Sequence, residues 1–533
     1  MGVRKVLFLL LFAIRILSAG QLQAQQEQTM PWYYQMPDDT LAAAGIDSAQ
    51  KILSNIVAEE IVVAVIDAGV DTSHIALQDH IWINEDEIPG NDKDDDNNGY
   101  TDDTHGWNFL GNKNGENLQG APYEFVRIYD TLRQKFQSPG YDSIPKGKNP
   151  KLDLYREVSA EYNKRVKEIN KRLSTYNKIL EGYNEASKIL KKHFDKKDFD
   201  LDDIRKIDAQ RKDVEWAVNY YTKLADRGIS KQNIETRVRT AQSVLKTKLN
   251  PDYHPRKIIN DNVKNIRDSV YGNNDVNGGT ASHGTAVAGI ITTRQKYKIG
   301  FKGIAPKVKI MPVRAIPGGD EWDKDVALAI RYAVKNGADI INGSFGKMYS
   351  PNKQMVDSAI RYAAKNDVLV VIGAGNDHKN NDLRPNYPNK FYADSAIAPN
   401  VISVGASNSD SLQNMIASFS NYGKKQVDIF APGVNIHALN TNHRTRKISG
   451  TSAAAPVVTG VAALIKTHYP AIKAADLKTI LMESVTDYSE LDVKIPGSED
   501  TLKKLDEICT SGGVINAYKA VRLTKKLFRE GKL

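Results

Sequence analysis

Three residues far apart in the chain are of the types that cooperate in nucleophilic catalysis: a carboxylate at Asp67, an imidazole at His283 and a hydroxyl at Ser452. A serine becomes a nucleophile when a histidine takes its proton and a carboxylate orients that histidine. Small residues surround Ser452, and the apolar run after it predicts a buried helix whose N–H groups and positive dipole end lie beside the hydroxyl. Because serine at a helix start is more often a plain cap, the other two residues must decide its role.

Predicted elements place both partners. Residues 61–66 are all apolar and rich in β-branched side chains, which is typical of a strand buried on both faces of a parallel sheet. Asp67 follows at the carboxyl end, where functional groups of such sheets gather, and an acid in this position needs a partner. His283 lies in the first turn of a predicted helix, framed by small residues that allow close backbone approach. A lone histidine is more often structural or exposed.

The rest of the chain alternates between strand and helix patterns. Apolar strand patterns recur at residues 308–313, 338–341, 368–372, 401–404 and 427–430, and helix patterns separate them at 324–336 and 353–366. Alternation of this kind predicts an α/β fold with a doubly wound parallel sheet.

The order Asp67, His283, Ser452 is that of subtilisin, whereas lipase-like α/β hydrolases have serine first. Five blocks support this order: residues 65–71, 283–289, 341–346, 373–376 and 449–456. On these blocks the chain resembles the subtilisin-like serine proteases over about residues 59–105 and 274–521. A sister class has Glu and Asp in place of the histidine, and His283 and Asn376 disfavour it.

The resemblance implies a serine endopeptidase that acts on polypeptide substrates. It implies that Ser452 attacks the scissile carbonyl, that His283 carries the proton and that Asp67 orients the ring. It further implies that Asn376 stabilises the oxyanion, and that two backbone edges bind substrate: Ser344, Phe345 and Gly346, and Gly373, Ala374 and Gly375. The peptide bond between Tyr387 and Pro388 could be cis. The alternative function is a catalytically silent scaffold that binds a partner.

Residues 85–103 form an acidic segment. Oxygen-bearing side chains alternate at Asp94, Asp96 and Asn98, and the carboxylates of Asp102 and Asp103 follow. Close carboxylates repel one another unless a hard cation lies among them, so these five residues predict a structural calcium site. The twelfth residue from Asp94 is His105 rather than Glu, so the pattern is not that of a helix-loop-helix calcium loop. A solvated acidic turn is the alternative.

Residues 111–260 differ in composition and predict a helical, coiled-coil-like insertion with helices at 152–194, 203–226 and 230–249. Apolar residues recur every seven positions along the first helix, at Tyr155, Tyr162, Ile169, Tyr176, Tyr183 and Leu190. This seam packs on the chain itself or on a protein partner. We read its basic residues as a solvated face, with membrane or acidic-partner binding as the lesser option. Our hypothesis is that the insertion shields the active-site cleft or selects substrates.

Length and composition bound the remaining possibilities. The 533 residues are 41% hydrophobic, enough for a large core. The net charge of +9 accompanies 64 acidic residues, so we do not predict nucleic-acid binding. The single cysteine, Cys509, excludes an intramolecular disulfide.

The N-terminus has the charged start, short apolar run and small-residue end of a signal peptide, and no later segment could span a membrane. We expect export from a bacterial cell, to the periplasm or the exterior. The predicted domains are a signal peptide (1–24), an extension (25–58), the first peptidase part (59–110), the insertion (111–260) and the second peptidase part (261–533).

Overall fold

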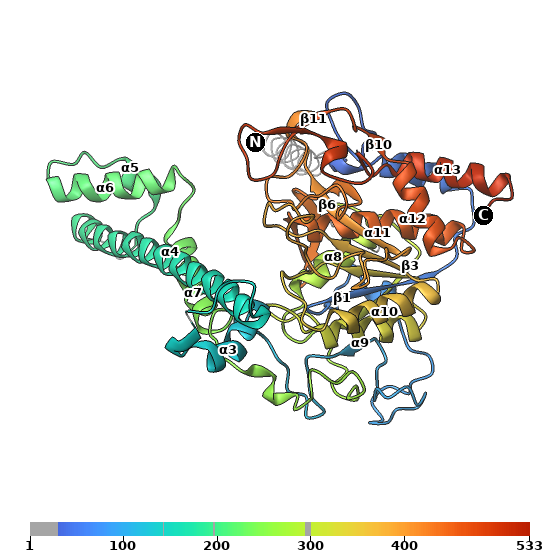
Figure 1. The fold of residues 1–533 in the computed structure, drawn as a ribbon. Helices are drawn as coiled ribbons and strands as arrows, with labels where there is room; N and C mark the ends of the chain where they lie inside the picture. The colour runs from blue at the N-terminus through green and yellow to red at the C-terminus, as the bar shows by residue number, and fades with distance from the viewer. Residues whose placement is uncertain (1–29, 142, 196–197, 294–299) are drawn as a thin grey trace, which may run out of the picture.

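A mostly parallel sheet forms the centre of the structure, a computed structural model that describes residues 30–141, 143–195, 198–293 and 300–533 (Figure 1). The predicted signal peptide, residues 1–24, lies outside these ranges. Within them the sheet has nine strands in the order β10-β13-β7-β6-β5-β4-β1-β3-β2. The strands are β1 Ile61–Asp67, β2 Trp107–Asn108, β3 Val308–Arg314, β4 Ile340–Gly343, β5 Leu369–Gly373, β6 Val401–Ser407, β7 Ile429–Pro432, β10 Thr486–Asp487 and β13 Gly513–Val514.

Strand β1 lies between β3 and β4 and pairs with both in parallel. Its alternate residues enter two different cores: Val63 and Val65 pack on one face of the sheet, and Ala64 and Ile66 on the other. Both faces are therefore covered, which is why the strand reads as an unbroken apolar run. Among the strands of this sheet that the described residues form, only β10 runs antiparallel to its neighbour, β13. The predicted α/β fold with a doubly wound parallel sheet is confirmed.

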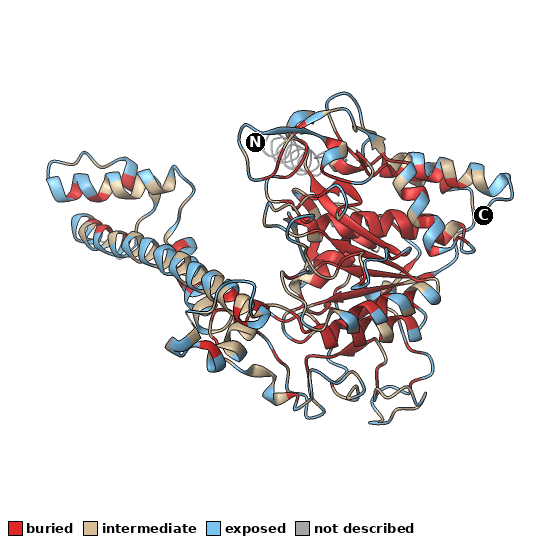
Figure 2. Ribbon diagram, viewed as in Figure 1, coloured by how far each residue is buried: buried red, intermediate tan, exposed pale blue. Residues whose placement is uncertain are grey.

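Helices cover both faces of the sheet. One face packs on α8 (Ser282–Ile291) and α11 (Thr451–His468), and the other on α9 (Asp323–Lys335) and α10 (Lys353–Lys365). Figure 2 shows the buried residues concentrated in this layered body. Further helices are α2 Ile46–Leu53, α12 Ala474–Glu483 and α13 Ala517–Arg529, and two hairpins join β8 Ile436–Asn440 to β9 Arg444–Ile448 and β11 Asp492–Lys494 to β12 Leu502–Lys504. Short 3-10 helices are η1 Trp32–Tyr34, η2 Gln78–His80, η3 Pro139–Tyr141, η4 Pro255–Ile258, η5 Leu412–Asn414 and η6 Leu505–Glu507.

Residues 111–260, called the helical insertion below, extend away from the sheet (Figure 1). The helices are α3 Glu124–Phe136, α4 Pro150–Phe194, α5 Leu201–Arg205, α6 Lys212–Ala225 and α7 Lys231–Lys246. The prediction of α4 and α7 is confirmed. The helix expected to start at residue 203 instead starts at Lys212, because α5 is a separate short helix, and α3 was not predicted. The domain boundaries drawn from composition remain predictions.

The seven-residue seam of α4 packs within the chain. Tyr162 stacks on Tyr129 of α3 at 4.5 Å between ring centroids, and Tyr183 packs on Tyr221 of α6 at 5.1 Å. The periodicity left two possibilities open, packing on the chain itself or on a protein partner. In the structure the seam contacts helices of the same chain. No helix in the described ranges is both long enough and apolar enough to cross a bilayer.

Candidate active site

The side chain of Asp67, at the end of β1, contacts the ring of His283. His283 Nδ1 lies 2.8 Å from Asp67 Oδ1 and 2.9 Å from Oδ2, and the Asp67 side chain is 3% exposed. Because an ionised carboxylate only accepts hydrogen bonds, Nδ1 carries the proton and Nε2 is left as the acceptor. His283, 216 positions away, is thus the partner that the sequence required for the buried Asp67 carboxylate.

A glycine permits this contact. An added Cβ at Gly284 would lie 2.2 Å from the carbonyl oxygen of Gly69 and 3.0 Å from Asp67 Cβ. Helix α8 therefore approaches the turn after β1 closely only because residue 284 has no side chain. This close approach places His283, one position earlier, within hydrogen-bond distance of the Asp67 carboxylate.

Two charges act on His283 in opposite directions. Asp67 raises the pKa of the ring by its charge and its hydrogen bond, while burial and the guanidinium of Arg446 lower it, and the net shift is upward. Arg446 lies on β9 and donates from Nη2 to the carbonyl of Ser282 at 3.0 Å. Sequence reasoning did not identify Arg446, because nothing in its local pattern distinguishes it from the basic residues around it.

Ser452 is the second residue of α11, after Gly450 at the N-cap. Gly450 has φ +151°, and an added Cβ there would lie 2.9 Å from Ser452 Oγ and 3.6 Å from Asn376 Nδ2. The Ser452 hydroxyl and the Asn376 amide therefore both lie close to the backbone of Gly450. Within the described ranges, Ser452 Oγ makes no hydrogen bond to the His283 ring.

The amide of Asn376 is oriented by the start of α11. Asn376 Oδ1 accepts from the N–H of Thr451 at 2.8 Å and from its hydroxyl at 3.2 Å. A backbone N–H can only donate, so the oxygen must face Thr451 and Nδ2 must point elsewhere. Asn376 is exposed, and the described part of the chain provides no acceptor for Nδ2. This donor is available for another group.

The segment 344–346 contacts the start of α11. Ser344 Oγ donates to the carbonyl of Ser452 at 3.1 Å and accepts from Asn342 Nδ2 at 2.9 Å. Asn342 Oδ1 in turn accepts from the hydroxyl of Thr459, further along α11, at 2.8 Å. This side-chain role of Ser344 was not predicted, since it links the end of β4 to a helix more than 100 residues later. Phe345 is half-buried and Gly346 is exposed.

The segment 373–375 is already bonded within the protein. The N–H of Ala374 donates to Val404 at 2.9 Å, and the N–H of Gly375 donates to Thr451 Oγ1 at 3.1 Å. The carbonyl of Ala374 accepts from two asparagine side chains at 2.9 and 3.0 Å. Gly373 is buried as the last residue of β5. The peptide bond between Tyr387 and Pro388 is cis.

All of these residues meet at one edge of the sheet. Asp67 ends β1, Ser344 follows β4, and Asn376 follows β5, and these three strands run parallel. Ser452 joins them through the bond from Ser344 and through its neighbour Thr451, which contacts Asn376. The edge therefore brings together a carboxylate, an imidazole, a hydroxyl and an oriented amide.

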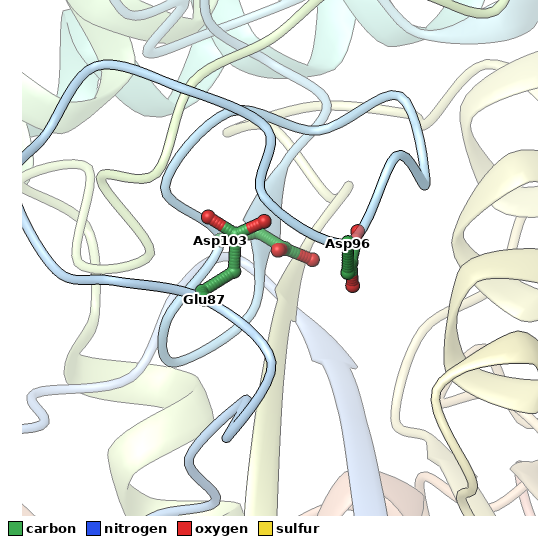
Figure 3. A group of neighbouring side chains, drawn as sticks. All are labelled: Glu87, Asp96 and Asp103. Carbon is green, nitrogen blue, oxygen red and sulfur yellow. The ribbon is translucent and has the colours of Figure 1, made fainter.

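A second cluster of carboxylates lies in the acidic segment (Figure 3). Oxygen atoms of Glu87, Asp96 and Asp103 lie within 4.8 Å of one another. Asn98 donates from Nδ2 to Asp96 at 2.8 Å and to Asp103 at 3.2 Å. Asp96, Asn98 and Asp103 are thus together, as predicted from their spacing.

The other two predicted ligands shape the loop. The Asp102 carboxylate accepts from the N–H groups of Gly90, Asn91 and Asp92 at 2.8, 3.2 and 2.8 Å. Asp94 accepts from the N–H groups of residues 98 and 99 at 2.9 and 2.8 Å. Both carboxylates are therefore already satisfied by turns.

Glu87 takes a place in the cluster that sequence reasoning missed. Glu87 is 5% exposed, and its Oε2 is buried without a hydrogen-bond partner among the described residues. Burial raises the pKa of Glu87 and also that of Asp103. An orphaned buried oxygen beside two other carboxylates is the donor set that a hard cation fits. The only sign of this role in the sequence was that Glu87 belongs to the same acidic segment as Asp96 and Asp103.

Comparisons with known proteins show which family the chain resembles. The subtilase family, Peptidase_S8, matches residues 189–501, which include His283 and Ser452 but not Asp67. The thermophilic serine proteinase of Bacillus sp. strain AK1 is 38% identical over 185 residues, which are 34% of this chain and 42% of that protein. The cell wall-associated protease of Bacillus subtilis is 36% identical over 208 residues, 39% of this chain and 21% of that protein.

Subtilisin DY of Bacillus licheniformis is 33% identical over 222 residues, which are 41% of this chain and 74% of that protein. The chain spans less than half the length of the two longer relatives. The matched region nevertheless exceeds half of this chain, and the resemblance seen in the five sequence blocks is confirmed. The chain belongs to the subtilase family.

Proposed function

We propose that this protein is a serine endopeptidase that hydrolyses polypeptides through an acyl-enzyme. The observation that carries the proposal is the contact between the buried Asp67 carboxylate and His283 Nδ1, at 2.8 Å, at the carboxyl ends of the strands, where Ser452 lies in the first turn of α11. Membership of the subtilase family supports the same chemistry.

In this mechanism His283 Nε2 takes the proton of Ser452 as Oγ attacks the scissile carbonyl. Asp67 holds the Nδ1–H and stabilises the imidazolium that forms. His283 then gives the proton to the leaving amine, and a water molecule attacks the acyl-enzyme by the same route in reverse. The bond between Ser452 and His283 forms when substrate binds, since catalytic hydrogen bonds in free enzymes are often long.

The oxyanion of the tetrahedral intermediate is stabilised by Asn376 Nδ2 and the N–H of Ser452. The orientation of the Asn376 amide by Thr451 supports this role, because a preorganised donor costs no reorganisation when charge develops. We further propose that the backbone of Ser344, Phe345 and Gly346, which is exposed at Gly346, pairs with an extended substrate. Gly373, Ala374 and Gly375 contribute less, since the N–H groups of Ala374 and Gly375 are already bonded.

Covalent labelling tests the proposal. A fluorophosphonate probe is expected to label the folded protein, and Ser452→Ala is expected to abolish the labelling. Labelling that persists in Ser452→Ala would place the nucleophile elsewhere. A folded wild-type protein that neither labels nor cleaves a peptide library would favour the catalytically silent scaffold.

We also propose that Glu87, Asp96 and Asp103 hold a structural calcium ion. Support comes from their proximity and from the orphaned Glu87 Oε2, which a cation would satisfy. Bound calcium would supply positive charge that offsets repulsion among the carboxylates. Asp102 and Asp94 shape the surrounding loop, and Asn98 bridges two of the ligands.

Export from a bacterial cell is the proposed localisation. It rests on the signal-peptide pattern of residues 1–24 and agrees with similarity to a protease that is associated with the cell wall. Fractionation of cells that express the full chain, followed by immunoblotting, tests it. Retention of the uncleaved chain in the cytoplasm would contradict the proposal.

A further inference from the structure

A cleft of about 870 Å³ lies between the helical insertion and the peptidase body. Its walls come from α3, the start of α4 and residues 251–264 on one side, and from Trp322, Asp323, residues 348–352 and Tyr387 on the other. Much of the lining is apolar, including Ile128, Leu132, Leu154, Val263 and Met348. Clefts of this volume, about 300–1,000 Å³, are typical of ligand sites.

The cleft lies directly after the proposed substrate-binding segment along the chain. Residues 348–352 follow directly after 344–346 and Lys347, whose backbone pairs with Tyr387 through two bonds of 2.9 Å. Lys347 Nζ also contacts Glu124 of α3 at 2.7 Å. A chain that pairs with residues 344–346 and continues past Lys347 therefore reaches the cleft.

The charges on the lining favour an acidic occupant. The three carboxylates of the lining are each paired with a cation: Glu124 with Arg127 at 2.5 Å, Asp323 with Lys347 at 2.8 Å, and Asp130 with Arg133 at 2.9 Å. Lys151, Lys257 and Lys264 are exposed, and none has a carboxylate within 4.0 Å in the part of the chain that the structure describes. Three exposed lysines that have no carboxylate partner among the described residues thus line the cleft together with apolar side chains.

We propose that this cleft is a second binding site for polypeptide substrates, one that selects a segment carrying acidic and apolar residues next to the cleavage region. The inference rests on the proposed function and extends it to the choice of substrate. The insertion forms one wall, so this site depends on the insertion. Exposed charge pairs each change affinity by about two- to fivefold, so three together act as a selectivity filter.

Peptide cleavage tests the selectivity. One fluorogenic core peptide is extended at either end by four residues that alternate Glu with Leu, or by four that alternate Lys with Leu. The acidic extension at one of the two ends is expected to raise kcat/KM about tenfold over the basic one. The triple variant Lys151→Glu, Lys257→Glu, Lys264→Glu is expected to bring that ratio to one or reverse it.

A matched control carries the same charge change elsewhere. Lys167, Lys171 and Lys178 are exposed residues of α4 that do not line the cleft. Their triple change to Glu is expected to keep the preference. An equal loss of preference in both triple variants would mean that overall charge alone steers the substrate, and would overturn the proposal.

A binding measurement tests this inference independently of the proposed function. Fluorescence anisotropy of the acidic peptide is measured with the full chain carrying Ser452→Ala, so no turnover is needed. We expect the cleft triple variant to weaken binding about tenfold and the control variant to leave it unchanged. Equal binding of acidic and basic peptides would refute the site even if the enzyme cleaves peptides, and acid-selective binding without cleavage would refute only the proposed function.

Discussion

Lys347 and Glu124 form a buried ion pair, 2.7 Å from Nζ to Oε2, that joins the helical insertion to the residue directly after Gly346. The side chains are 2% and 9% exposed, and Lys347 also contacts Asp323 at 2.8 Å. Arg127 completes the group and stacks on Trp322 at 4.4 Å. A buried ion pair therefore holds the insertion beside the proposed substrate-binding segment.

Breaking this pair should destabilise the protein strongly. Removing one partner leaves the other charge buried, so Glu124→Gln or Lys347→Met is expected to cost about 3–5 kcal/mol of unfolding free energy. Urea denaturation measures the loss. Arg205→Ala, which removes an exposed ion pair with Asp226 within the insertion, serves as the control and should change stability by less than about 0.5 kcal/mol. Similar losses in both variants would contradict a special role for the buried pair.

The same pair predicts an acid limit for the docking of the insertion. Burial opposes ionisation of Glu124, but Arg127 and Lys347 outweigh it and lower the pKa to about 2. A carboxyl with a lowered pKa stabilises the fold above its unfolded value, 4.5 here, and this contribution is lost as the pH falls from 4.5 toward 2. Melting temperature measured between these pH values should fall less steeply in Glu124→Gln than in the wild type.

Asn376→Ala should lower kcat far more than it changes KM. The Asn376 amide would act on the charge that develops in the transition state, and loss of such a donor in subtilisin itself reduces kcat about 100- to 1,000-fold. Steady-state cleavage of a short peptide measures both constants. A rise in KM with unchanged kcat would instead assign Asn376 to substrate binding.

The pH dependence of cleavage should move in opposite directions in two variants. Neutral His283 is the base, so kcat/KM falls as the pH drops through the pKa of its ring. Arg446 lowers that pKa, so Arg446→Gln is expected to move the acid limb to higher pH. Asp67 raises the pKa, so Asp67→Asn should move the limb to lower pH, with activity reduced about 10,000-fold.

Lys447→Gln is the control for Arg446→Gln, because Lys447 is an exposed neighbour on β9 that does not act on the His283 ring. Its acid limb should match that of the wild type. Equal shifts in the two variants would attribute the effect to net charge rather than to Arg446.

Calcium should raise the melting temperature through Glu87. A ligand at a hundredfold excess over its Kd stabilises the folded state by about 2.7 kcal/mol, and chelation with EDTA should remove this contribution. Glu87→Gln and Asp103→Asn are expected to abolish the calcium-dependent increase. Glu85→Gln, at an exposed residue outside the cluster, should retain it. A calcium effect that survives in Glu87→Gln would show that the ion binds elsewhere.

Much of the fold could be predicted from local patterns. Residues 61–66 form a buried strand because an unbroken apolar run suits a strand covered on both faces, and residues 152–194 form one helix because their apolar positions recur along a single face. The start of α6 was misplaced, since a capping box at Asp200 makes α5 a separate helix that ends at Arg205. Helix α3 was also missed.

The sequence by itself determined the family and the sheet and predicted the residues proposed for catalysis, because each of these depends on residue types in short blocks and on periodicities along the chain. Only the tertiary structure decided that Glu87 joins Asp96 and Asp103, that Arg446 acts on His283, and that Lys347 binds Glu124 across 223 positions. Such contacts depend on how loops and helices from distant parts of the chain pack together. Burial then gives them their strength, since charges interact strongly only where water is excluded.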